Sequence, residues 1–138
     1  MIIGIGTDLC DIRRIEGSLD KFGARFIDRI FTQSEKDYCN PKSGKASYYA
    51  KRFAAKEAVA KALSGAATGH LKWQDVEVKN DPSGRPSVYL YRAANKRLAD
   101  LTPKGYQAHV HLSLTDEYPY AQAFAVVEAH KAEPLRTE

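Results

Sequence analysis

The chain has 138 residues, enough for one domain with a hydrophobic core, and its 43% hydrophobic and 28% charged residues are typical of a globular protein. No apolar run approaches the roughly 20 residues of a membrane span, and two cysteines exclude a disulfide framework, so we expect a cytoplasmic protein. The net charge of +4 favours an anionic partner without identifying it.

Residues 3–10 alternate in the manner of a β-strand. The alternation places Ile3, Ile5 and Leu9 on one face, and Gly4, Gly6, Asp8 and Cys10 on the other. Glycines within a strand usually mark a place where another group approaches the backbone closely. Asp8 therefore has two interpretations, as a cap for the next element or as a ligand-binding acid on a cleared face.

Residues 12–30 repeat apolar side chains at steps of three and four, which predicts a helix, split near Gly17 or Gly23. Arg14, Lys21 and Arg25 lie nearly in line beside the apolar stripe. They could form an ordinary solvated face or a docking surface for an acidic helix or a phosphate backbone. No stacking aromatics are interleaved with them, which argues against single-stranded nucleic acid.

Residues 48–63 form the most strongly predicted helix, because they are rich in Ala, Leu, Lys, Arg and Glu and contain no Gly or Pro. Glu57 and Lys61 lie one turn apart on one face of this helix. On a solvated face such a pair contributes only about 0.2–0.5 kcal/mol. The alternative is that both side chains belong to a site.

The remaining segments predict an α+β fold, in one domain over residues 1–130 followed by a tail over 131–138. Thr32 and Glu35 form a capping box for a short helix. We expect a hairpin from 73–79 and 85–91 with Val76 and Val78 on one face and Glu77 on the other, a helix over 92–101, and strands over 106–114 and 120–128. The last strand is apolar on both faces, which predicts a central place in a mainly antiparallel sheet packed against the long helix.

Asp8 and Glu57 are the best pair of hard oxygen ligands in the sequence. Two carboxylates suit Mg²⁺, which keeps several waters and takes other ligands from substrate phosphates. Lys61, one turn beyond Glu57, could then contact a phosphate oxygen. His111 lies on a polar strand face, either as a structural histidine or as a ligand contact or proton relay.

Four motifs together resemble the holo-[acyl-carrier-protein] synthases, the small bacterial 4′-phosphopantetheinyl transferases. They are residues 4–8 with Arg14 following, residues 51–58 with Lys61, residues 80–86, and residues 111–117. The resemblance runs from residue 2 to about residue 128 and implies that family's fold. The segment from Ser64 to Gly69 departs from the Gly-Thr-Gly run that many members carry directly after the helix.

The resemblance implies a reaction in which the 4′-phosphopantetheine arm of coenzyme A moves to a serine of acyl carrier protein, in support of fatty acid biosynthesis. By motif, Asp8 and Glu57 would hold Mg²⁺, and Lys61 and His111 would contact phosphate. The side chains that would lie along the nucleotide are Arg52, Arg85 and Pro86. The general base stays open between Glu57 and a metal-bound water.

The resemblance also implies partners, since acyl carrier proteins present an acidic helix to which Arg14, Lys21 and Arg25 would dock. Members of the family are homotrimers with active sites between subunits. No nucleic acid or membrane partner is expected. Two alternatives are another Mg²⁺-dependent phosphoryl or nucleotidyl transferase, and a basic module that binds RNA or acidic proteins and uses Asp8 and Glu57 structurally.

Overall fold

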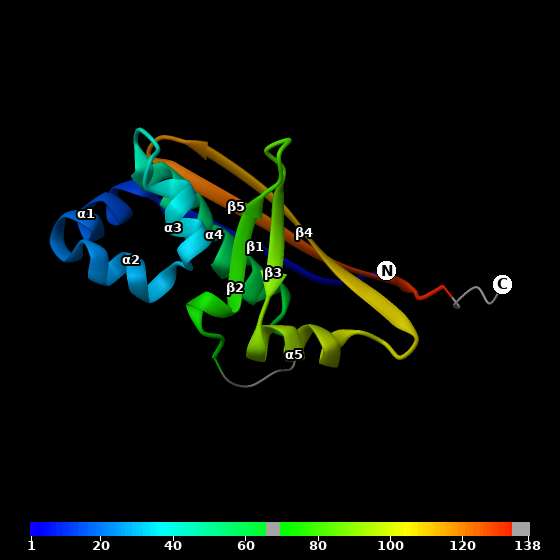
Figure 1. Ribbon diagram of the computed structural model, residues 1–138. Coiled ribbons are helices and arrows are strands. Elements are labelled where there is room, and N and C mark those ends of the chain that lie inside the picture. The colour runs from blue at the N-terminus through cyan, green and yellow to red at the C-terminus, as the bar shows by residue number, and fades with distance from the viewer. Residues whose placement is uncertain (66–69, 134–138) are drawn as a thin grey trace.

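A three-stranded antiparallel sheet and a separate two-stranded hairpin flank one long helix in the computed structural model, which describes residues 1–65 and 70–133 (Figure 1). The elements are β1 (Ile2–Asp11), α1 (Ile12–Phe22), α2 (Ala24–Ile30), α3 (Gln33–Cys39), α4 (Lys45–Ala62), the 3₁₀ turn η1 (Trp73–Asp75), β2 (Val76–Asn80), β3 (Pro86–Leu90), α5 (Arg92–Leu101), β4 (Tyr106–Glu117) and β5 (Tyr120–Lys131). The α+β fold with a mainly antiparallel sheet against the central helix is confirmed. No helix in the described ranges is long and apolar enough to cross a membrane.

Strand β5 is central, as its two apolar faces predict, and the sheet order is β1-β5-β4. The inner face of β5 carries small side chains that are fully buried, which lets α4 lie close to the sheet. On β1, a Cβ added to Gly4 or Gly6 would lie 2.0 Å from the carbonyl oxygen of Ala62 or Ala58. The group that approaches the glycines is thus the backbone of α4.

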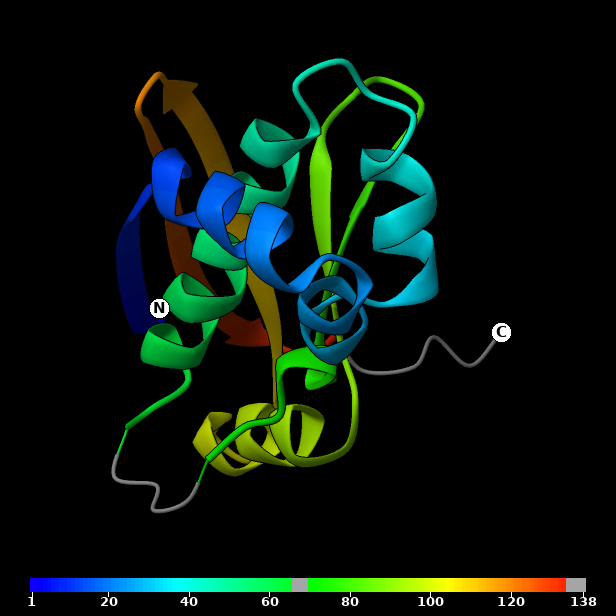
Figure 2. The same cartoon turned by 90° about the vertical axis from the view of Figure 1, so that its left-hand side faces the viewer.

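The outer face of the sheet is left uncovered by the described helices and strands, as Figure 2 shows. Ile5 and Leu9 are each 62% exposed there, and Phe124 is 42% exposed. The predicted alternation of β1 is therefore right, but its apolar side faces outward. The face cleared by glycines is the one that packs on the core.

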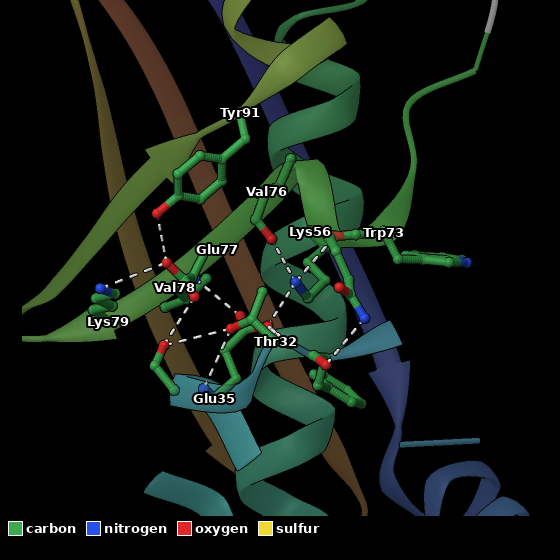
Figure 3. Close-up of polar contacts among 12 residues, drawn as sticks. Thr32, Glu35, Lys56, Trp73, Val76, Glu77, Val78, Lys79 and Tyr91 are labelled. Carbon is green, nitrogen blue, oxygen red and sulfur yellow. Dashed lines mark hydrogen bonds and ion pairs between the residues drawn. The ribbon is translucent and has the colours of Figure 1, made fainter. Parts of the chain in front are cut away.

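Helix α4 is joined to α3 and β2 by a buried ion pair that the sequence did not suggest (Figure 3). Lys56 Nζ lies 2.8 Å from Glu35 Oε1 and also donates to the carbonyl oxygens of Trp73 (3.1 Å) and Val76. Glu35 is the capping-box residue of α3, and its Oε2 accepts the Val78 amide at 2.9 Å. One lysine therefore fixes the register of three elements.

Both faces of the first hairpin strand are buried at Glu77, which lies on the face opposite Val76 and Val78. Glu77 is only 6% exposed. Ser34 Oγ (2.9 Å) and Tyr91 Oη (2.8 Å) donate hydrogen bonds to its carboxylate. Those hydrogen bonds hold its pKa below the ordinary value although burial acts in the opposite direction. Alternation alone could not show that this polar face is buried, because the partners that satisfy the carboxylate are distant in sequence.

Three of the predicted helix and strand boundaries are refined by the structure. The helical stretch over residues 12–30 splits at Gly23, whose φ of +54° favours glycine. Strands β4 and β5 extend beyond the predicted residues 114 and 128 because they pair with each other along their whole length. Of the predicted tail, Lys131 ends β5 and residues 134–138 lie outside the described residues, as do positions 66–69 of the loop after α4.

Candidate active site

The predicted acid pair meets where β1 crosses α4. Lys61 Nζ donates to Asp8 Oδ1 (3.1 Å) and to the carbonyl oxygen of Thr7 (2.9 Å). The Asp8 side chain is 18% exposed, whereas that of Lys61 is 54% exposed. The close packing of α4 on the glycines of β1 brings these residues together, so Asp8 and Lys61 are partners in space although 53 residues apart in sequence.

Glu57 is partly buried beside them, and burial raises the pKa of its carboxyl above the ordinary value. The charge of Asp8 raises this pKa further, while the ammonium of Lys61 opposes the shift. A bound cation would favour the charged form of Glu57 and so offset the effects of burial and of Asp8. Hard oxygen donors in this number fit Mg²⁺ rather than an all-protein calcium cage. Within the described ranges, no group of three or more His, Cys, Asp or Glu is arranged to hold a metal ion.

A cleft of about 330 Å³ opens beside the acid pair, between the end of β1 and helices α1, α2 and α4. Asp8 and Glu57 line it together with Arg14, Phe26 and Phe53. The cleft therefore connects the acid pair with the basic helices.

The basic side chains predicted for docking lie on those helices. Arg14 and Lys21 are exposed on α1, and Arg25 is exposed on α2. The Lys21 ammonium lies 5.2 Å from the centroid of the Phe22 ring, which is 46% exposed itself. Cations and an apolar ring on one surface suit an acidic partner with some apolar character.

A second groove, of about 610 Å³, lies between the hairpin and the edge strand β4. It is lined by Arg85, Pro86, His109 and His111, so three of the residues predicted to contact coenzyme A do come together. No residue that lines this groove also lines the cleft at Asp8. The predicted site is thus divided into two parts within one chain.

The sheet register explains the division. Asp8 lies opposite Ala123, which is fully buried. His111 lies opposite Val126, and Val126 is paired on its other side with the exposed Ile5. Residues directly opposite each other in an antiparallel sheet share a face. Asp8 and His111 therefore project from opposite faces of the sheet.

Arg52 is the predicted site residue with the least access to solvent, at 2% exposed. Its Nη2 donates to Asn80 Oδ1 at 2.6 Å, at the start of the hairpin turn, and its guanidinium carbon lies 4.1 Å from the centroid of the Tyr38 ring. Its Nε has no hydrogen-bond partner among the described residues. In the chain by itself the guanidinium contacts the hairpin from the interior.

A third cleft, of about 400 Å³, reaches Glu57 from the side of the hairpin and α5. His70, Lys72 and Arg97 line it, and the sequence did not mark any of them as site residues. Lys72 lies between the predicted segments, and Arg97 belongs to the helix predicted over 92–101. Only the folded chain brings their side chains to Glu57, so no local pattern could have identified them.

Comparisons with known proteins agree with the motifs. A family model described as the 4′-phosphopantetheinyl transferase superfamily matches residues 4–123. The holo-[acyl-carrier-protein] synthase of Phenylobacterium zucineum is 53% identical over 138 residues and 100% of both chains. That of Methylorubrum extorquens is 53% identical over 129 residues, 94% of this chain and 95% of that protein.

Solved structures give the same result. The crystal structure of the holo-[acyl-carrier-protein] synthase of Neisseria meningitidis has a TM-score of 0.78 and 37% identity, covering 93% of this chain and 99% of that one. The Helicobacter pylori synthase, solved in complex with coenzyme A, has a TM-score of 0.73 and 28% identity, covering 90% of this chain and 99% of that one. The α+β arrangement is therefore shared over nearly the whole chain.

Proposed function

Because the chain belongs to the 4′-phosphopantetheinyl transferase superfamily, it transfers the 4′-phosphopantetheine group of coenzyme A to apo-acyl carrier protein, and we propose that it does so with Mg²⁺ held by Asp8 and Glu57. The observation that carries the proposal is the meeting of these carboxylates with Lys61 at one end of a cleft. The products are holo-acyl carrier protein and adenosine 3′,5′-bisphosphate, and the reaction serves fatty acid biosynthesis.

In the proposed reaction a serine hydroxyl of the carrier attacks the β-phosphorus of the pyrophosphate. The new P–O bond forms as the bond to the bridging oxygen breaks and the leaving phosphate takes up charge. Bound Mg²⁺ would neutralise phosphate charge. Lys61, which in the free chain is satisfied by Asp8, would exchange this contact for a phosphate oxygen. The general base stays open between Glu57, whose raised pKa favours proton uptake, and water.

The carrier protein is proposed to dock on α1 and α2 through Arg14, Lys21 and Arg25. All three are exposed, and Arg14 also lines the cleft at the acid pair. Acidic side chains of a carrier helix would be steered to this surface, and the serine would then enter the cleft beside Asp8. Both cysteines are buried and unpaired, which supports the reducing cytoplasm as the setting.

The active form is proposed to be a homotrimer with sites between subunits. Two observations support this proposal. Residues predicted to bind nucleotide, Arg85, Pro86 and His111, lie in a groove separate from Asp8 and Glu57, so a complete site needs a neighbour. The outer face of the sheet also exposes large apolar side chains, which a second copy could cover.

The proposal is tested by incubating the purified protein with coenzyme A, Mg²⁺ and apo-acyl carrier protein and weighing the carrier by mass spectrometry. We expect a carrier heavier by one phosphopantetheine, and no product after chelation of Mg²⁺. Asp8→Asn and Glu57→Gln should each lower the rate by roughly 100-fold or more, because each removes a charged ligand. Asp100→Asn removes an exposed carboxylate of α5 and serves as the matched control.

Thermal unfolding separates lost chemistry from lost folding in these variants. Burial raises the Glu57 pKa, so the fold loses stability as pH rises through that pKa and the carboxylate ionises. Glu57→Gln should therefore raise the melting temperature of the metal-free protein at neutral pH, and the difference should vanish in acid. Full activity in either ligand variant, or Mg²⁺-independent transfer, would refute the metal assignment.

A further inference from the structure

The third cleft, of about 400 Å³, meets the site already described at one side chain. Glu57 lines this cleft and also the cleft at Asp8, and no other described residue lines both. The cleft at Asp8 is bounded by α1 and α2, whereas the third cleft is bounded by η1, β2 and α5. A group held beside Glu57 therefore has two separate ways out within one chain.

An aromatic stack forms part of the wall between the two clefts. Phe53 lines the cleft at Asp8 and Trp73 lines the third cleft. Their rings are stacked, with centroids 5.0 Å apart and planes at 30° to each other. Figure 3 shows the indole of Trp73 directed away from the ion pair of Lys56 and Glu35. The ring is therefore free of that polar cluster and available as an apolar surface of the third cleft.

The third cleft combines apolar side chains with a basic rim. Its buried or half-buried apolar side chains are Ala60, Leu71, Trp73 and Val76, and the exposed or half-buried basic ones are His70, Lys72 and Arg97. The ammonium of Lys56 also belongs to the lining but is paired with Glu35. Apolar walls favour a ligand with an apolar body, and N–H donors at the rim favour carbonyl oxygens. The lining thus suits an elongated, uncharged group that carries amides.

The proposed reaction requires a place for such a group next to Glu57. The β-phosphorus gains the serine oxygen and loses the bridging oxygen, with these two roughly in line. The oxygen of the pantetheine arm stays on the phosphorus and points to the side of that line. The serine is proposed to enter through the cleft at Asp8, so the arm needs another path away from Glu57. The third cleft supplies that path.

We propose that the third cleft binds the pantetheine arm of coenzyme A. The dimethyl end of the arm packs against Ala60 and Trp73, and its amide carbonyls accept hydrogen bonds from Lys72 and Arg97. This inference rests on the proposed function, because the pyrophosphate must lie beside Glu57 for the arm to enter the cleft. Adenosine 3′,5′-bisphosphate lacks the arm, so the cleft should distinguish this product from coenzyme A.

Tryptophan fluorescence tests the proposal in the unmodified protein, because Trp73 is the single tryptophan of the chain. Coenzyme A with Mg²⁺ should shift the Trp73 emission, whereas adenosine 3′,5′-bisphosphate at the same calorimetrically measured saturation should leave it unchanged. The two ligands carry the same adenine, so light absorption by the nucleotide affects both titrations equally. An equal shift with both ligands, or no shift with either at saturation, would overturn the proposal.

Filling the cleft gives a second test. Ala60→Phe adds a ring to the α4 wall and should raise the KM for coenzyme A about tenfold or more, a loss of roughly 1.4 kcal/mol of binding. The Ki of adenosine 3′,5′-bisphosphate should stay the same. Ala93→Phe adds the same ring at an exposed position of α5 that lines none of the clefts described above, and it should match the wild type. Thermal unfolding shows whether Ala60→Phe is folded, and the fluorescence test decides without it.

The outcomes separate this inference from the proposed function. An unchanged KM for coenzyme A in folded Ala60→Phe, or an equal loss of affinity for both ligands, would refute the arm site while wild-type transfer left the proposed function standing. A Trp73 response to coenzyme A alone, in a protein that transfers nothing to apo-acyl carrier protein, would instead place the failure in the proposed function.

Discussion

At the scale of single residues, Gly6 is as restrictive as any charged residue of the site. The carbonyl oxygen of Ala58 lies 2.0 Å from the position that a Cβ on Gly6 would take. Any side chain there would push α4 away from β1 and so separate Asp8 from Glu57 and Lys61. The glycines of β1 thus serve the site through packing and not through direct contact with a ligand.

Gly6→Ala should accordingly destabilise the protein by roughly 3 kcal/mol, because the contact is with backbone and cannot be relieved by a rotamer change. Urea unfolding measures this loss, and the variant should also bind Mg²⁺ more weakly. Gly17→Ala is the matched control: nothing lies within 4 Å of its added Cβ, and alanine favours the helix by about 0.5–1 kcal/mol. Equal stability of Gly6→Ala and the wild type would disprove the close approach.

At the scale of elements, the buried pair of Lys56 and Glu35 sets the position of the hairpin relative to α4 (Figure 3). Lys56 precedes Glu57 in the same helix turn, and its carbonyl partners lie on η1 and β2. Burial lowers the Lys56 pKa, and Glu35 opposes that shift. The helix that carries Glu57 and the hairpin that leads to Arg85 are therefore joined by this charged contact as well as by that of Arg52 with Asn80.

Lys56→Met should cost about 3–5 kcal/mol of unfolding free energy, because it leaves the Glu35 charge buried without a cation. Adding Glu35→Gln should recover about 1 kcal/mol or more of this loss, as removal of the charge relieves the penalty. Lys36→Met breaks an ion pair with the exposed Asp28 and should cost less than about 1 kcal/mol. Strictly additive losses in the double variant would contradict the coupling.

At the scale of the whole molecule, the outer face of the sheet is exposed in the folded chain, and the proposed trimer would cover it. Asp8 projects from the inner face of the sheet toward Glu57 of α4, whereas His111 projects from the outer face, and the hairpin groove shares no residue with the cleft at Asp8. The proposed trimer would cover the exposed Leu9 and Phe124 and would complete each site with a groove from a neighbour. Assembly would then be a condition of activity.

Phe124→Glu should shift the protein from trimer toward monomer in size-exclusion chromatography with light scattering, since it places a charge on the face to be covered. Transferase activity should fall with the trimer fraction and recover as protein concentration rises. Phe22→Glu changes another exposed phenylalanine, on α1, and should leave the oligomeric state unchanged. A wild-type protein that is monomeric and fully active would remove the trimer from the proposal.

Local sequence patterns were sufficient to predict the elements and one half of the site. Helical and strand periods are local properties, so they predicted α4, the hairpin and the central place of β5, and they put Glu57 and Lys61 on one helix face. Glycines beside Asp8 indicated a close approach to that strand face. The family motifs added the reaction and the expected partners.

The burial of individual faces and the pairing of distant side chains depend on contacts between segments that are far apart in the sequence. Glu77 turns inward and Lys56 pairs with Glu35 because their partners come from segments that no local pattern connects to them. Arg52 is buried against the hairpin, and Lys72 and Arg97 reach the side of Glu57. Asp8 and His111 fall on opposite faces because the strand register sets the face of every side chain in the sheet.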